Sequence, residues 1–534
     1  MSVSLRSLKS GTSAIAVLGT ALSFATIGSA VAQDQPAAAG AAAPTEEIVV
    51  TGTRIRSNNI TAAEPLQVVT AAQIQETKAI TLEDYLQKLP TVDFNSISQN
   101  NNNGGVGASQ AAIHNLGAQR TLVLVNGLRF PGTDTQGTFA PVDLNNIPIS
   151  MVDHIEVLTD GANSIYGADA IAGVINVITK KDFNGFEATG SIGGTSAGDR
   201  LSYDASATLG IGNDRGNVII NLAYSEQNPV PQRDRDWASK QYRDADGNLI
   251  GATSGRPPGL LLIDPTTGAS KYFGGVHNDL VLQPGNRFDL TQIPYLVGEL
   301  QTKQANLSGH YDLTDGITAV VEGFFTDRGS HQRLNPDPVD FLTTTIKYPN
   351  GFVLPYCLYG MTDATTASGC APQQGHPSGV NPNAIRAGVT SDQLARTRRF
   401  EGGPRNYSDT IDTYRLRIGL EGTLLNDYNW QIGYVYGASN ARYETQGALN
   451  FTHLFQLAGL VPCGVDALQG CRIGNVVGDN TLTKKDVAYM EFIDTRTSQI
   501  EQDYAYGDIS GPIPFVPELP GGPVKFDVGF EYRN

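Results

Sequence analysis

The sequence predicts an exported α+β domain followed by a transmembrane antiparallel β-barrel. Three observations lead to this fold class: a cleavable export signal, about nine alternating segments of roughly ten residues, and connections that alternate between short and long. Beyond the signal, no segment has the roughly 20 apolar residues that a spanning helix requires. The mature chain is therefore expected either to cross a membrane with strands or to be soluble outside the cytoplasm.

The first 32 residues have the three parts of a secretory signal. Arg6 and Lys9 supply the positive region, residues 14–27 form the apolar region, and residues 30–32 make a small-x-small cleavage site. The apolar run is too short for a membrane anchor. We therefore expect a signal peptide over residues 1–32, followed by an Ala-, Pro- and Gln-rich linker that reaches residue 59.

Composition and cysteine usage narrow the range of functions. The 534 residues carry a net charge of −16, which repels phosphate backbones and argues against nucleic-acid binding. The four cysteines form two close pairs, which in an exported chain predict two local disulfides. The nearest histidines, His376 and His453, match no familiar zinc spacing, so no metal site is expected. The disulfide candidates are Cys357, Cys370, Cys463 and Cys471.

Residues 60–180 read as the compact α+β domain. A short strand over residues 66–69 leads into a helix that Thr70 caps, and a second helix opens at Thr81 and stops at Pro90. Buried strands are expected at residues 120–126, 155–158 and 174–178, with a tight turn at Asn126-Gly127.

Residues 181–534 carry the period-two pattern of membrane strands. The alternating segments are residues 186–192, 201–209, 218–224, 305–311, 317–323, 414–420, 430–436, 500–509 and 524–532. Short turns are expected at residues 212–214, 314–316, 426–427 and 520–523, and long connections over residues 227–301, 328–409 and 441–497. Because alternate connections of an up-and-down barrel emerge at opposite ends, the long ones should share one side. A soluble β-sandwich, with short and regularly spaced strands, fits less well.

Two further patterns are weighed against their structural alternatives. Residues 194–198 match the nucleophile-elbow pattern, but alternating strands flank them, so a hairpin turn is expected and no enzyme is inferred. Four aromatic residues fit either a girdle at the lipid interface or core packing: Trp430, Tyr504, Tyr506 and Tyr532.

Several blocks in a fixed order make the chain resemble a TonB-dependent outer-membrane receptor. Residues 46–54 resemble the TonB box, and three later blocks, at residues 116–127, 142–158 and 160–176, resemble the motifs of the plug domain. The residues carried over to TonB binding are Glu47, Ile48, Val49, Val50 and Thr51. The residues carried over from the plug motifs are Leu116, Gly117, Arg120, Asn126, Gly127, Glu156, Asp160, Gly161, Tyr166, Gly167, Gly173 and Asn176.

The resemblance implies a signal, a linker with the TonB box (residues 33–59), an α+β plug domain inside the barrel (residues 60–180) and a partial barrel (residues 181–534). It implies import across the outer membrane of a Gram-negative bacterium, driven through the periplasmic domain of TonB. The implied ligand is a small molecule, a ferric siderophore first, with cobalamin and oligosaccharides open. A passive porin or an adhesin without energy coupling is the alternative.

The chain departs from the family pattern in two places. The family has Arg-Gly where this chain has His114-Asn115, and we expect a packed or loop histidine rather than a ligand. Barrels of the family have about 22 strands, whereas this sequence offers about nine. Since an open barrel leaves unpaired edges in lipid, we expect the chain to be the N-terminal part of a longer receptor.

Overall fold

The computed structural model describes residues 51, 66–77, 79, 81–92, 107–134, 141–159, 163–239, 259–263, 270–274, 281–282, 291–339, 392–394, 397–398, 402–425, 427–457, 470–472, 482–516, 519 and 523–534. The predicted signal peptide, most of the linker and four of the five predicted box residues lie outside these ranges. So do Asp160, Gly161, Cys357, Cys370 and Cys463.

A five-stranded sheet forms the centre of the N-terminal domain, the described part of residues 51–180. Its strand order is β1-β4-β5-β2-β3, with β2 and β5 parallel and the other neighbours antiparallel. The strands are β1 (Leu66–Thr70), β2 (Thr121–Val125), β3 (Leu128–Arg129), β4 (Val152–Leu158) and β5 (Gly173–Thr179). Every residue of β2 is buried, as its unbroken apolar run predicts.

Short helices pack on this sheet where the sequence places capping residues. Thr70 caps α1 (Ala71–Glu76) in a capping box with Gln73, and α2 (Leu82–Leu86) buries Leu82, Tyr85 and Leu86. The remaining helical turns are η1 (Ala118–Arg120), η2 (Leu144–Asn146), η3 (Ile149–Met151), α3 (Asn163–Tyr166) and η4 (Ala168–Ala170).

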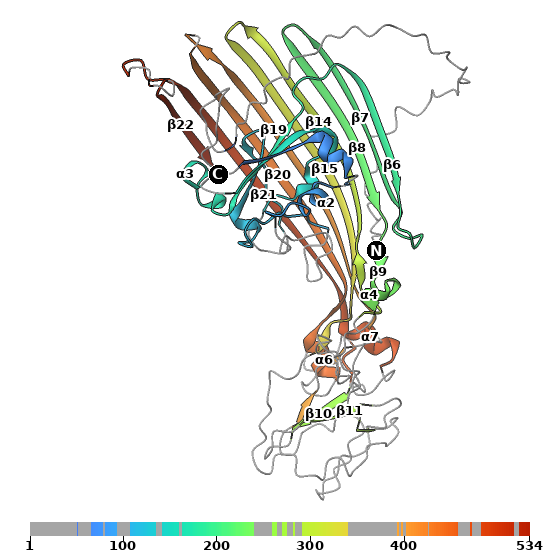
Figure 1. Cartoon of the computed structure of the whole chain (residues 1–534). Helices are drawn as coiled ribbons and strands as arrows, with labels where there is room; N and C mark the ends of the chain where they lie inside the picture. Colours follow the sequence, from blue (N-terminus) through green and yellow to red (C-terminus); the bar gives the residue numbers. More distant parts are fainter. Residues whose placement is uncertain are drawn as a thin grey trace, which may run out of the picture. The chain divides into compact units, whose positions relative to one another are not determined.

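Nine antiparallel strands form one meandering sheet, which we call the wall (Figure 1). The strands are β6 (Gly185–Gly193), β7 (Ser202–Asn213), β8 (Gly216–Gln227), β14 (Glu299–Thr314), β15 (Ile317–Leu334), β19 (Arg405–Leu424), β20 (Tyr428–Leu449), β21 (Glu491–Pro512) and β22 (Lys525–Arg533). The order β22-β21-β20-β19-β15-β14-β8-β7-β6 follows the chain, and β6 and β22 are its two edges among the described residues. The predicted count of nine strands is confirmed.

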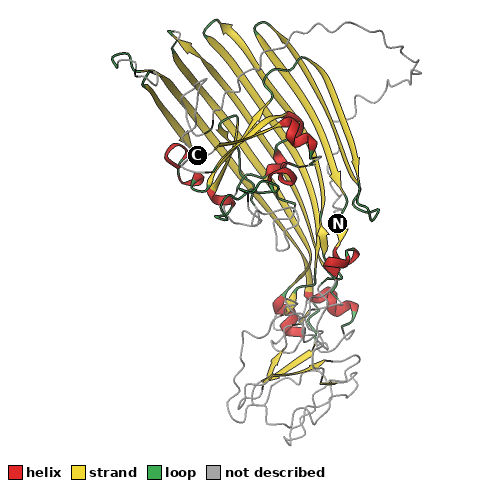
Figure 2. Ribbon diagram, in the orientation of Figure 1, coloured by secondary structure: helices red, strands yellow, loops and turns green. Residues whose placement is uncertain are grey.

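The short and long connections are sorted by side, as predicted. The tight hairpins β7–β8, β14–β15 and β19–β20 lie at one end of the strands, and the three long connections leave from the other end (Figure 2). Residues 194–201 form the turn between β6 and β7, which confirms the hairpin reading of the elbow-like pattern.

Side chains of the wall alternate between an apolar outer face and a polar inner face. In β8, Val218, Ile220 and Leu222 are exposed, whereas Asn217 and Asn221 are buried on the side of the N-terminal domain. This arrangement is the one expected for a membrane strand that faces lipid on one side and a polar interior on the other.

The predicted strand length of about ten residues fits β6, β7, β8 and β22 but was too short for the other wall strands. β15 has 18 residues, β19 has 20, and β20 and β21 have 22 each. Residues assigned to long connections continue the ladder instead; Leu334, for example, pairs with Arg405. Backbone pairing continues past the apolar band, where both faces of the strands become polar and the alternation of hydrophobicity disappears.

The long connections contain secondary structure of their own. Near the wall they include β9 (Val230–Pro231), η5 (Gln232–Asp234), α4 (Asp236–Ser239), β13 (Tyr295–Val297), α6 (Phe451–Leu457) and α7 (Lys484–Met490). Further strands are β10 (Gly259–Ile263), β11 (Ser270–Gly274), β12 (Val281–Leu282), β16 (Pro338–Val339), β17 (Asp392–Leu394) and β18 (Thr397–Arg398). Cys471, in the last long connection, is disulfide-bonded. Within the described ranges, no helix is both long and apolar enough to cross a bilayer.

Two motif glycines in the N-terminal domain make different demands on the backbone. Gly173 has φ +141°, and a Cβ there would lie 2.4 Å from the carbonyl oxygen of Leu158, whereas Gly167 has φ +85° with no atom within 4 Å of a Cβ. We expect Gly173→Ala to destabilise the domain by about 2–4 kcal/mol and Gly167→Ala by about 1 kcal/mol. Scanning calorimetry of the full-length protein measures both, and equal losses would contradict the clash at Gly173.

Candidate functional site

The last residue of the predicted box, Thr51, is buried against the central sheet of the N-terminal domain. Its backbone N–H donates to Glu156 Oε2 at 3.1 Å, and its hydroxyl donates to the same oxygen. The Asn176 amide donates to Thr51 Oγ1 at 2.8 Å and to Glu156 Oε2 at 3.1 Å. We call these three residues the Thr51 anchor.

Strand register places the two partners of Thr51 side by side. Glu156 in β4 and Asn176 in β5 are paired residues of neighbouring strands, and both are fully buried. A buried carboxylate requires several donors to offset the loss of water. Thr51 supplies two of them and Asn176 a third, while His154 Nε2 lies 3.5 Å from Glu156 Oε1. The other ring nitrogen of His154 contacts Asp153 at 2.8 Å and lowers the pKa of that carboxyl.

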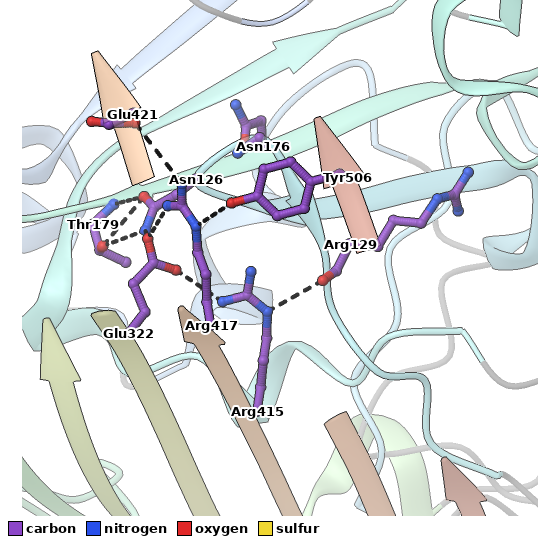
Figure 3. A network of polar contacts seen from close by, with 10 residues as sticks. Asn126, Arg129, Asn176, Thr179, Glu322, Arg415, Arg417, Glu421 and Tyr506 are labelled. Carbon is purple, nitrogen blue, oxygen red and sulfur yellow. Dashed lines mark hydrogen bonds and ion pairs between the residues drawn. The ribbon is translucent and has the colours of Figure 1, made fainter. Parts of the chain in front are cut away.

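The Asn126-Gly127 turn connects the anchor to the wall. Both residues have positive φ, +53° and +76°, as a two-residue hairpin turn requires. The Gly127 N–H donates to Asn176 Oδ1 at 3.0 Å, and the Asn126 amide donates to Glu322 Oε1 of β15 at 3.0 Å. Thr179 holds the Asn126 side chain through its N–H at 2.9 Å and its hydroxyl (Figure 3).

On the wall, Glu322 lies between two arginines of β19, and these side chains with Tyr506 form what we call the wall cluster. Arg415 donates to Glu322 Oε2 at 3.0 Å, and Arg417 donates to Oε1 at 2.6 Å (Figure 3). Arg417 Nε also donates to the Tyr506 hydroxyl at 2.9 Å. All four side chains are buried, so the ion pairs are screened little by solvent.

Arg415 also reaches the N-terminal domain directly. Its Nε donates to the carbonyl oxygen of Arg129 at 3.2 Å, and its guanidinium lies near both Phe130 of the domain and Phe324 of the wall, 5.9 and 5.8 Å from the ring centroids. The wall cluster therefore faces the turn that carries Asn126.

Further contacts join the N-terminal domain to the wall elsewhere, including two between polar side chains. Arg328 Nε of β15 lies 3.0 Å from Asp143 Oδ2, and both side chains are buried. Asn221 of β8 donates to the Ser150 hydroxyl at 3.0 Å. Neither contact includes a residue of the Thr51 anchor.

A cavity of about 360 Å³ lies between the N-terminal domain and the early wall strands. Its wall side carries hydroxyl and amide groups, and its domain side includes apolar residues of α1, α2 and η3. The polar lining includes Thr189, Ser206, Thr208, Ser225, Thr302 and Gln304. The cavity therefore lies between a polar face of the wall and a partly apolar face of the N-terminal domain.

The structure gives distinct positions to the residues predicted from the plug motifs. Glu156, Asn176, Asn126 and Gly127 come together, whereas the exposed side chain of Arg120 donates to the carbonyl oxygen of Leu116 at 2.9 Å. The Tyr166 carbonyl accepts from Arg129 at 2.7 Å. Positive φ values mark Gly117, Gly167 and Gly173.

The wall cluster was not predicted from the sequence, although the sequence of β19 contains a pattern that indicates it. Arg415 and Arg417 alternate with the exposed Leu416 and Ile418 in β19, so two charges face inward in a membrane strand. The girdle alternative is wrong for Tyr504 and Tyr506, which are buried and pack with Leu128 of the N-terminal domain. Tyr532 is exposed.

The departure at His114-Asn115 is a loop, as expected. Both residues have positive φ, +55° and +56°, and His114 Nε2 lies 2.8 Å from the carbonyl oxygen of Thr159. Among the described residues, no group of three or more His, Cys, Asp or Glu side chains could hold a metal ion.

The chain is similar to known proteins in its N-terminal domain and along most of its length. Residues 58–174 match the family model of the TonB-dependent Receptor Plug Domain. Solved structures similar to the chain include a ferric enterobactin receptor mutant (PfeA) of Pseudomonas aeruginosa, with 13% identity and a TM-score of 0.47 over 88% of this chain and 49% of that one. They also include the siderophore receptor PiuA of Acinetobacter baumannii, with 12% identity and a TM-score of 0.40 over 88% of this chain and 61% of that one.

The ferric yersiniabactin uptake receptor FyuA of Yersinia pestis is a further similar structure, with 10% identity and a TM-score of 0.38 over 88% of this chain and 60% of that one. The chain thus spans about half to three-fifths of the length of these receptors. Through residues 58–174 it carries the plug domain of a TonB-dependent receptor, and it is a protein of the Gram-negative outer membrane.

Proposed function

We propose that this TonB-dependent receptor binds a scarce extracellular ligand and imports it into the periplasm with energy delivered through TonB. The observation that carries the proposal is the Thr51 anchor, which holds the end of a strand-forming segment by contacts that can be broken and remade. A segment held in this way can become available to a partner when the anchor opens.

The proposed handle for TonB is the segment Glu47 to Thr51. In a strand, residues 48–51 would place alternate side chains on two faces, and main-chain hydrogen bonds supply affinity when such a strand adds to the edge of a partner's sheet. Thr51 itself is 4% exposed. TonB is therefore proposed to bind the segment after the anchor releases it.

A ferric siderophore is the ligand class that we propose. Three arginine side chains lie over tyrosine rings on strands β13, β15, β19, β20 and β21. The distances from the guanidinium carbon to the ring centroid are 5.1 Å for Arg333 and Tyr295, 5.9 Å for Arg405 and Tyr407, and 5.1 Å for Arg496 and Tyr443. The residues lie toward the long-connection ends of their strands. Cationic and aromatic groups together suit an anionic, aromatic chelate. Cobalamin and oligosaccharides are the other candidates.

The proposed chemistry is transport without covalent change. Nothing in the anchor or the wall cluster requires a cofactor, because each interaction is a hydrogen bond, an ion pair or a packing contact. A passive porin or an adhesin is the second candidate, and it differs by having no need for TonB.

Uptake with and without TonB separates these candidates. We expect cells that carry the full-length protein to grow on a ferric siderophore under iron limitation and to accumulate its labelled iron, because energised release of the plug opens the route. Deleting TonB is expected to reduce accumulation to background while surface binding of the chelate persists. Accumulation at the same rate without TonB would identify a passive pore and overturn the proposal.

A further inference from the structure

The Thr51 anchor and the wall cluster lie at the two ends of one line of hydrogen bonds. Asn176 donates to Thr51 Oγ1 at 2.8 Å and accepts from the Gly127 N–H at 3.0 Å. The adjacent Asn126 donates to Glu322 at 3.0 Å, and Arg415 and Arg417 hold Glu322 at 3.0 and 2.6 Å. The line therefore starts at the proposed TonB handle and ends in the membrane-spanning wall. Figure 3 shows the wall end of this line, from Asn126 to Glu322, Arg415 and Arg417.

We propose that Asn126 and Asn176 are positioning residues that couple docking of the TonB handle to docking of the plug on the wall. The inference rests on the proposed function, because it identifies the segment ending at Thr51 as the handle. It goes further by naming two uncharged amides as the link, and by placing the control of handle release at the Asn126–Glu322 contact.

The geometry makes Asn176 a shared partner. Both polar atoms of its side chain are hydrogen-bonded. The amide nitrogen donates to Thr51 and Glu156, and the amide oxygen accepts from the Gly127 N–H. Moving the Asn126-Gly127 turn away from β5 leaves the buried Asn176 oxygen without its donor, which has an energetic cost. Rotating Asn176 to recover a donor breaks the bonds at Thr51.

Asn126 transmits the position of the wall to the same turn. Its amide nitrogen spans Thr179 Oγ1 at 2.9 Å and Glu322 at 3.0 Å. Because Glu322 is held by two arginines of the wall, any displacement of the turn from the wall must break the Asn126–Glu322 bond. A ligand that draws the plug off the wall at this point is thus expected to weaken the hold on Thr51.

The test measures exposure of the handle in the full-length purified protein, without ligand and without TonB. Val50→Cys provides the probe site, its rate of reaction with a charged maleimide reports undocking, and the parent protein without this cysteine gives the background. Thr51→Val removes only the hydroxyl of the anchor. We expect it to raise the labelling rate roughly ten- to hundred-fold, the effect of losing hydrogen bonds to a buried carboxylate.

Asn126→Gly is the decisive variant, because glycine keeps the positive φ and removes only the amide. Although Asn126 does not touch Thr51, we expect labelling to rise roughly five- to tenfold. The matched control is Asn221→Ala, which removes a buried asparagine that bonds the plug to the wall through Ser150. This control should leave the rate within about twofold, since distant contacts that share no partner act independently.

The double variant Thr51→Val with Asn126→Gly completes a double-mutant cycle, which measures the coupling between the two sites. Coupling predicts a combined rate well below the product of the two single effects, because an anchor that is already open cannot be opened again. Multiplicative effects, equal rates for Asn126→Gly and Asn221→Ala, or an unchanged rate in Thr51→Val would each overturn the proposal. If Asn126→Gly fails to fold, Asn126→Asp places a carboxylate against Glu322 and must raise labelling for the proposal to hold.

Failure of this inference is distinct from failure of the proposed function. Labelling requires neither TonB nor ligand, whereas energised import is tested by accumulation of iron in cells with and without TonB. An uncoupled handle can still be pulled by TonB. Normal import with multiplicative labelling effects would therefore reject the coupling alone.

Discussion

Replacing Val49 with proline is expected to abolish uptake and leave ligand binding intact. Proline has no N–H, so it removes a ladder donor from the middle of a five-residue segment proposed to pair with TonB as a strand. We expect accumulation of labelled iron to fall about tenfold or more, to the level of cells without TonB. Binding of the chelate to whole cells should be unchanged, because the ligand meets the opposite side of the protein.

Two controls restrict the effect to the proposed strand. Val49→Ala keeps the donor and should import at close to the parent rate, since main-chain bonds carry most of the affinity. Ala38→Pro places the same ring in the linker, outside the proposed strand. Normal uptake by Val49→Pro in the full-length protein would count against residues 47–51 as the handle.

Removing the Glu322 carboxylate is expected to be the most destabilising single change in the wall. Glu322→Ala leaves Arg415 and Arg417 buried with no acid between them. Breaking a buried pair from one side costs about 3–5 kcal/mol, because the remaining charge is uncompensated. Urea unfolding of the full-length protein in detergent measures this loss, and Glu299→Ala, on an exposed acid of β14, should change stability by less than about 0.5 kcal/mol.

Replacing the whole cluster distinguishes a charge effect from a packing effect. The triple variant E322M/R415M/R417L removes all three charges and keeps similar volumes. We expect it to lose far less stability than Glu322→Ala, or to gain stability, because buried ion pairs often contribute little beyond well-packed apolar side chains. If the triple variant is as unstable as Glu322→Ala, the hydrogen bonds of the cluster to Asn126, Arg129 and Tyr506 are the main loss.

Strand positions were predictable wherever one face is apolar and the other polar. The strand β8, for example, was predicted from the alternation of Val218, Ile220 and Leu222 with polar or inward-facing residues. An apolar residue at every second position indicates a strand with one face exposed to lipid. The ends of β15, β19, β20 and β21 were not predictable. There the strands extend past the apolar band and are held by backbone pairing, as between Leu334 and Arg405, which leaves no periodic trace in the side chains.

The sequence by itself determined the nine strands of the wall and the sorting of their connections by side, since each depends on local pattern. It also contained Glu156, Asn176, Arg415 and Arg417, without indicating what they touch. The tertiary structure alone decided that Glu156 holds Thr51 across 105 residues of chain and that Arg415 reaches Arg129 across 286. These contacts depend on strand register within the plug and on how it docks against the wall. Neither is a property of any single segment, because both follow from many segments packing at once.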